Sequence, residues 1–63
     1  MTVAQIEVEI AKTEKLITDI EISFALPELA SNRSELAKLQ ATYDARKRDL
    51  EDLMAAWESK AAE

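Results

Sequence analysis

A regular spacing of side chains between Leu36 and Trp57 constrains this chain more than any other feature. The positions recur at alternating steps of three and four residues, and they are Leu36, Leu39, Tyr43, Arg46, Leu50, Leu53 and Trp57. Such a repeat places one mainly apolar stripe along a long α-helix. The segment contains neither Gly nor Pro, so nothing in it interrupts a helix. A lone helix would leave this stripe in water, and therefore a partner stripe of similar length is needed.

The first half of the chain supplies that partner. The same spacing recurs in Val3, Ile6, Ile10, Thr13, Ile17, Ile20 and Phe24. We predict a helix over about residues 3–25, a tip over 26–32 and a second helix over about 33–61. Because the connection is short, the two helices should be antiparallel neighbours. The predicted fold is all-α: an antiparallel two-helix coiled-coil hairpin that forms a single domain over residues 1–63.

Turn signals support a break between the two stripes. Pro27 disfavours helical backbone at the preceding residue, and it can open a short helical turn at the tip. Asn32 is a typical N-cap, and Glu35 stands three residues later, where its side chain can reach back to the Asn32 amide. We therefore expect a capping box at the start of the second helix.

The composition excludes several kinds of chemistry. The 63 residues include no Cys, no His and no Gly. Without Cys and His there is no disulfide, no thiolate or imidazole metal ligand and no imidazole base, and without Gly there is no phosphate-binding loop. A two-helix hairpin also offers no enclosed pocket. We predict no catalytic, cofactor-binding or metal-binding residues, and expect the chain not to be an enzyme.

The sequence also bears on location. No apolar run is long enough to cross a membrane, and no signal peptide is recognisable. The absence of Cys suits a reducing compartment, so we expect a cytoplasmic protein. Met1 is followed almost at once by helix-like sequence, so we expect the chain to be one domain of a longer protein.

Charge is distributed unevenly around a net value of −5. Residues 33–48 carry five bases against two acids, whereas the segments on either side are acidic. A basic strip of this kind can follow a phosphate backbone, and we take these five as candidate nucleic-acid-binding residues: Arg33, Lys38, Arg46, Lys47 and Arg48. The alternative is a solvated face whose bases pair with nearby acids at helical spacing.

Three short motifs give the chain a family resemblance. The tip Pro27-Glu28-Leu29-Ala30, the following Leu36-Ala37-Lys38-Leu39-Gln40 and the closing Trp57-Glu58 together resemble the C-terminal coiled-coil domain of the ABC-F ATPases, soluble proteins with two ATP-binding cassettes. The resemblance implies an accessory hairpin that binds DNA or ribosomal RNA, with ATP hydrolysis in the cassettes of a parent protein. The chain departs from the family in two respects. Ala30 stands where an aromatic residue is frequent, and the net charge is acidic where some members are basic.

Two other residues are compatible with a different function. Val8 and Ile22 lie off the apolar stripe of the first helix. They are either ordinary surface aliphatics or a second contact surface. The alternative function is therefore a protein–protein interaction module that dimerises or docks on a partner helix. We expect a monomer or a weak dimer.

Overall fold

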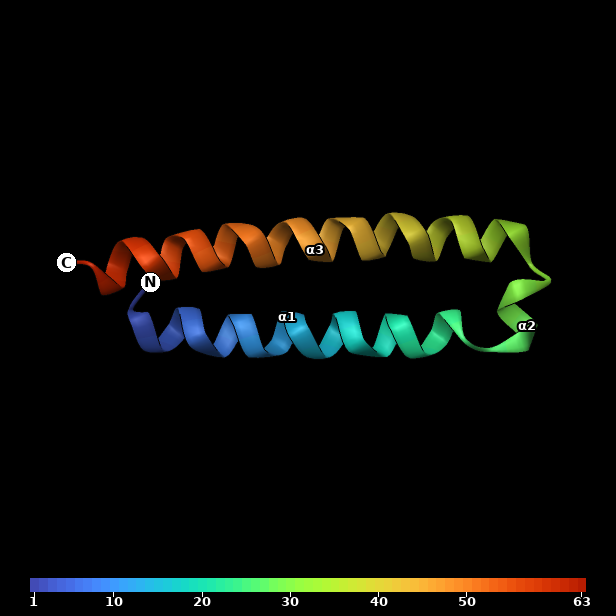
Figure 1. Cartoon of the computed structure of the whole chain (residues 1–63), viewed down its shortest axis with the longest axis horizontal. Helices are drawn as coiled ribbons and strands as arrows, with labels where there is room; N and C mark the ends of the chain where they lie inside the picture. The colour runs from blue at the N-terminus through green and yellow to red at the C-terminus, as the bar shows by residue number, and fades with distance from the viewer.

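The computed structural model describes residues 1–63 and consists of helices alone. Two long helices, α1 (Val3–Phe24) and α3 (Arg33–Ala61), flank a short α2 (Pro27–Ala30). The all-α prediction is thus confirmed. Figure 1 shows α1 and α3 side by side, with α2 at one end and both chain termini at the other. The molecule is a rod whose principal extents are 49 × 14 × 13 Å. Neither long helix has an apolar stretch sufficient to cross a membrane.

Side-chain caps define where α1 begins and where the tip turns. The Thr2 hydroxyl accepts a hydrogen bond from the Gln5 amide at 3.2 Å, while the Gln5 side chain accepts one from the Thr2 amide at 2.8 Å. This reciprocal pair is a capping box, and it satisfies two backbone donors that the helix cannot pair internally. At the other end Pro27 opens α2, where its missing N–H costs no hydrogen bond.

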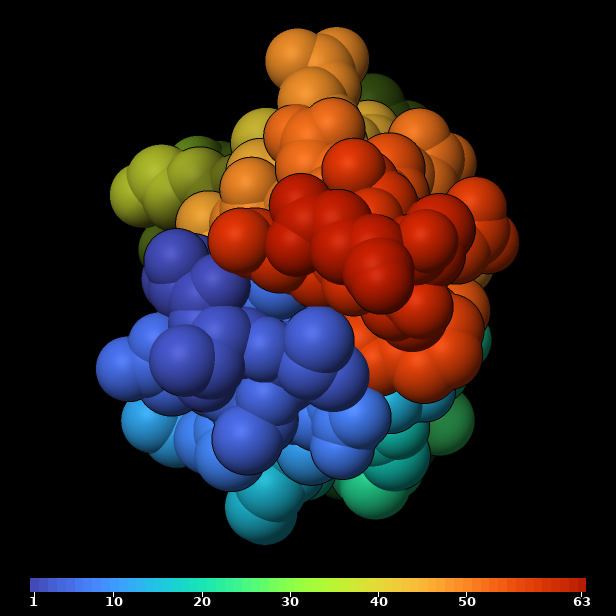
Figure 2. All heavy atoms as spheres, turned by 90° about the vertical axis from the view of Figure 1, so that its left-hand side faces the viewer, coloured from blue at the N-terminus to red at the C-terminus, as the bar shows by residue number.

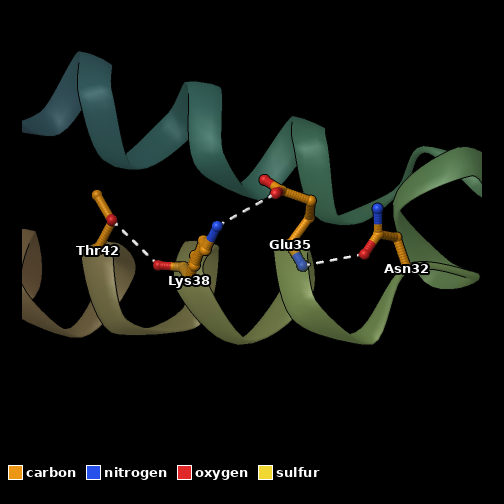
Figure 3. A network of polar contacts seen from close by, with 4 residues as sticks. All are labelled: Asn32, Glu35, Lys38 and Thr42. Atoms are coloured by element: carbon orange, nitrogen blue, oxygen red, sulfur yellow. Dashed lines mark hydrogen bonds and ion pairs between the residues drawn. The ribbon is translucent and has the colours of Figure 1, made fainter.

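The predicted capping box at the start of α3 is only half correct. The Asn32 side chain accepts a hydrogen bond from the Glu35 amide at 3.1 Å, as expected. The Glu35 carboxylate does not reach back to Asn32, because it faces Lys38 at 3.5 Å instead (Figure 3). The Asn32 amide donates to the Leu29 carbonyl at 3.0 Å. A basic residue one turn along the helix has therefore drawn the carboxylate away.

The buried core lies entirely on α1. Only four residues are buried, and they are Ile6, Thr13, Ile17 and Ile20. The stripe of α3 is half-buried at Leu36, Leu39, Tyr43, Arg46, Leu50 and Leu53. Two helices cannot enclose both stripes.

Three contacts fix how α1 and α3 face each other. The Tyr43 hydroxyl lies 3.2 Å from a Glu21 carboxylate oxygen, and the Trp57 indole nitrogen lies 3.1 Å from one of Glu7. The Phe24 and Tyr43 rings meet edge to face with centroids 5.5 Å apart. The end of α3 thus lies on the start of α1, and Figure 2 shows the N-terminal and C-terminal segments in contact at that end.

Trp57 corrects one expectation from the sequence. The unbroken repeat places its ring in the core, yet the residue is 37% exposed. It lies beside Glu7, in the second turn of α1, close to where that helix begins. The indole is held by its hydrogen bond to Glu7 rather than by enclosure.

Candidate functional site

The apolar stripes of α1 and α3 meet in a seam, and the helix pair has a distinct flank on each side of this seam. Glu7, Glu14 and Glu21 recur every seven residues and so occupy one side of α1. We call this side the glutamate flank. Tyr43 and Trp57, which are also a whole number of heptads apart, bind Glu21 and Glu7 there. The opposite flank carries Glu9 and Leu16 of α1 with Asp49 of α3, which line one shared groove.

Arg46 has a different partner from the one its sequence position suggests. As a stripe residue with a long stem, it should send its guanidinium to solvent or to a carboxylate of the first helix such as Glu14 or Glu21. Instead its guanidinium lies 3.2 Å from Asp49 on its own helix. The reason is geometric, since Arg46 lines grooves on the opposite flank while Glu14 and Glu21 lie on the glutamate flank.

Lys38 is likewise engaged by its own helix. Its ammonium group lies 3.5 Å from Glu35, and the Thr42 hydroxyl donates to the Lys38 carbonyl at 3.1 Å (Figure 3). These residues line a groove of about 500 Å³ at the tip, together with Ser23, Leu26, Glu28, Leu29, Asn32 and Leu39. Lys38 therefore lines the tip groove and is already paired with a carboxylate.

The remaining three predicted bases are free of carboxylate partners. All five ion pairs of the molecule involve other bases, namely Lys12, Lys15, Lys38, Arg46 and Lys60. Arg33, Lys47 and Arg48 are exposed, and Lys47 lies over the Tyr43 ring with its nitrogen 5.5 Å from the centroid. We call these three residues the free basic group.

The free basic group lies on one side of α3. Arg33 and Lys47 are two heptads apart and therefore occupy the same position around the helix. Arg48 follows Lys47 directly and lies about 100° further round. Of the five predicted bases, the structure thus leaves three without a carboxylate partner and pairs Lys38 and Arg46 with Glu35 and Asp49.

Sequence reasoning missed the row of carboxylates on the glutamate flank. The signal was present, because Glu7, Glu14 and Glu21 are spaced by whole heptads directly after stripe residues. Their role as acceptors for Tyr43 and Trp57 depends on how the helices are aligned, which the spacing alone does not supply. No group of three or more potential metal ligands comes together anywhere in the structure.

Comparison with known proteins adds the family. The family model for the ABC transporter C-terminal domain matches residues 2–59. No curated protein and no solved structure gives a significant match. The matched segment contains all of α1, the tip and every base of the free basic group. It also contains α3 apart from the last residues of that helix. The chain belongs to the ABC transporter C-terminal domain family.

Proposed function

We propose that this chain is the non-catalytic accessory domain of an ABC-F-type ATPase, and that it contributes contacts to DNA or ribosomal RNA. In this proposal the chain works as an antiparallel coiled-coil hairpin, and ATP hydrolysis belongs to the cassettes of the parent protein. Family membership supports the accessory role. The hydrogen bonds from Tyr43 to Glu21 and from Trp57 to Glu7 support the hairpin, since each joins distant parts of the sequence.

The observation that carries the nucleic-acid contact is the free basic group. Bases that already pair with acids must lose that partner before they bind a phosphate. Arg33, Lys47 and Arg48 have none to lose, and all three come from the basic segment of α3. Arginine also suits phosphate because its planar guanidinium can form two parallel hydrogen bonds.

Charge sets the conditions under which this contact forms. The net charge of −5 repels a polyanion at long range, but the acids concentrate in residues 1–32 and 49–63. A nucleic acid laid across the tip-proximal half of α3 meets the basic segment first. Because each neutralised phosphate releases counterions, we expect binding by the isolated domain to be sequence-independent and to require low salt.

A charge-matched pair of variants tests the proposal. Replacing Arg33, Lys47 and Arg48 by Gln should strongly weaken binding of labelled duplex DNA or structured RNA at low salt. The control replaces Lys12, Lys15 and Lys60 by Gln, which removes the same charge from bases that already pair with acids. The control should bind nearly as well as the unmodified chain, and the measurement is fluorescence anisotropy as a function of salt.

The salt slope separates a defined contact from general attraction. Loss of three phosphate contacts should make the slope of log K against log salt shallower by about 2–3 for duplex DNA. Equal loss of binding in both variants would show that only net charge matters. No binding by the unmodified chain at low salt would remove the nucleic-acid function and leave protein contact.

Exposed aliphatics on α1 support a second candidate function, a protein–protein interaction module. Val8 and Ile22 are 52% and 61% exposed, and they occupy equivalent heptad positions with Lys15 between them. Lys15 pairs with Asp19, so the apolar surface is interrupted by charge. Such a surface favours weak association over a tight dimer.

Sedimentation equilibrium measures this association. We expect a monomer at micromolar concentration and a rise in average mass only towards millimolar concentration. Val8→Glu should suppress that rise, because it places a charge in the contact, whereas Ala41→Glu on an exposed position of α3 should not. A tight dimer that Val8→Glu dissolves would make protein contact the primary function.

A further inference from the structure

A groove on the glutamate flank lies at the end of the rod that holds the chain termini. Its volume is about 320 Å³, near the lower limit for small-ligand clefts and enough for a long side chain. Residues from both long helices line it, and they are Glu7, Ile10, Ala11, Glu14, Met54, Trp57 and Glu58.

The apolar walls of the groove are open to solvent. Met54 is 51% exposed and Trp57 is 37% exposed. The hydrogen bond from the Trp57 indole nitrogen to Glu7, at 3.1 Å, ties one edge of the ring to α1 and holds it in place. An exposed aromatic ring that is already immobilised loses little conformational entropy when a partner packs against it.

The charged members of the groove are all acidic. Glu7, Glu14 and Glu58 line it, and no base does. The side chains of Glu14 and Glu58 form no ion pair or hydrogen bond within the chain. Lys12 and Lys60, on neighbouring turns, are paired with Glu9 and Glu63. The groove thus combines apolar walls with carboxylates that have no positively charged partner.

We propose that this groove binds a basic segment of a partner protein by accepting an arginine or lysine side chain. The aliphatic stem packs along Met54 and Trp57, where apolar contact excludes water. The cation lies over the indole ring and within reach of Glu14 and Glu58. Charge complementarity selects this occupant, because the three carboxylates repel a phosphate backbone and attract a cation.

The proposal is independent of the nucleic-acid function proposed above. The groove uses α1 residues up to Glu14 and α3 residues from Met54 onward, whereas the free basic group lies in residues 33–48. A single domain can therefore hold a nucleic acid near the tip and a basic protein segment near the termini.

Trp57 is the sole tryptophan and reports directly on the groove. The probe is a capped hexa-arginine peptide at low salt, with capped hexaglutamine as the uncharged comparison. We expect hexa-arginine to change the emission of Trp57 saturably and hexaglutamine to leave it unchanged. Isothermal titration calorimetry supplies the affinity without relying on the fluorophore.

Two variants of equal charge distinguish the groove from general attraction. Glu14→Gln with Glu58→Gln should weaken hexa-arginine binding by about fivefold, as expected for two partly exposed ion pairs. Glu51→Gln with Asp52→Asn removes the same charge from the same end of α3 outside the groove, and should weaken it by less than about twofold. Circular dichroism checks that both variants remain helical.

Two results would overturn the proposal. Equal weakening in the two variants would mean that the peptide senses only the acidic charge of the domain. The second result is seen without peptide: Trp57 emission changes as the protein concentration rises, and the mass measured in the ultracentrifuge rises with it. This result would mean that a second copy of the chain fills the groove.

Discussion

Ile17→Ala should lower the free energy of unfolding by about 2–4 kcal/mol, the usual cost of removing a buried isoleucine side chain. Ile17 is one of the four buried residues and lies between Thr13 and Ile20 in the middle of α1. A domain of 63 residues has a total stability of only about 3–9 kcal/mol. The substitution therefore removes a large share of the stability, and urea unfolding followed by circular dichroism at 222 nm measures it.

Ile22→Ala provides a control in the same helix. Ile22 is 61% exposed, so its truncation removes little buried surface. Both substitutions replace Ile by Ala and gain the same few tenths of a kcal/mol in helix propensity. The difference between the two variants therefore isolates burial, and equal effects would show that the seam is not the core.

The main features of the fold could be predicted because the helix period is written directly into the sequence. The three-four spacing from Val3 to Phe24 and from Leu36 to Trp57 predicts two helices, and Pro27 and Asn32 mark the break between them. The structure has α1 over Val3–Phe24 and α3 over Arg33–Ala61. These features depend on neighbours along the chain, which a single sequence displays.

Features that depend on how the two helices meet could not be predicted in the same way. The exposure of Trp57 follows from its place beside the start of α1, and the choice of Asp49 as the partner of Arg46 follows from which flank Arg46 faces. Both depend on the geometry between helices rather than on spacing. The Thr2–Gln5 capping box is different, because its Thr-x-x-Gln pattern was visible in the sequence.

The same limit applies to the predicted nucleic-acid-binding residues. The sequence identifies the basic segment over residues 33–48. It does not show which of these bases pair with acids and which stay unpaired. Lys38 and Arg46 are engaged by Glu35 and Asp49, which leaves Arg33, Lys47 and Arg48. Both pairings are at a spacing of three residues, so helical spacing alone permits them. Which permitted pairs form depends on side-chain positions that the sequence does not fix.

Replacing the two polar residues of the seam, Thr13 and Arg46, by apolar residues should stabilise the domain. Thr13 is buried, and the Nε atom of Arg46 is buried without a hydrogen-bond partner. Leaving such a donor unpaired costs free energy, and apolar replacements of similar shape remove that cost. The Arg46 side chain is still 39% exposed, so loss of its ion pair with Asp49 matters little. We expect Thr13→Val with Arg46→Leu to raise the free energy of unfolding by about 1–2 kcal/mol.

The matched control makes the same two exchanges on exposed positions of the same helices, Thr18→Val with Arg48→Leu. These residues lie outside the seam, so the control should change stability by less than about 0.5 kcal/mol. Urea unfolding of both double variants measures the difference. A loss of stability in the seam variant would mean that Thr13 and Arg46 stabilise the seam.

The stabilised seam should also be less specific. A polar residue in a seam of this kind favours one alignment of the helices at a cost in stability, because other alignments would bury it against apolar neighbours. Thr13 and Arg46 interrupt the two apolar stripes in adjacent layers, and we expect them to serve that purpose. We expect the Thr13→Val, Arg46→Leu variant to self-associate at micromolar concentration, which sedimentation equilibrium detects as a mass above that of the unmodified chain. A variant that is both more stable and strictly monomeric would show that the remaining contacts, from Tyr43 to Glu21 and from Trp57 to Glu7, already fix the alignment.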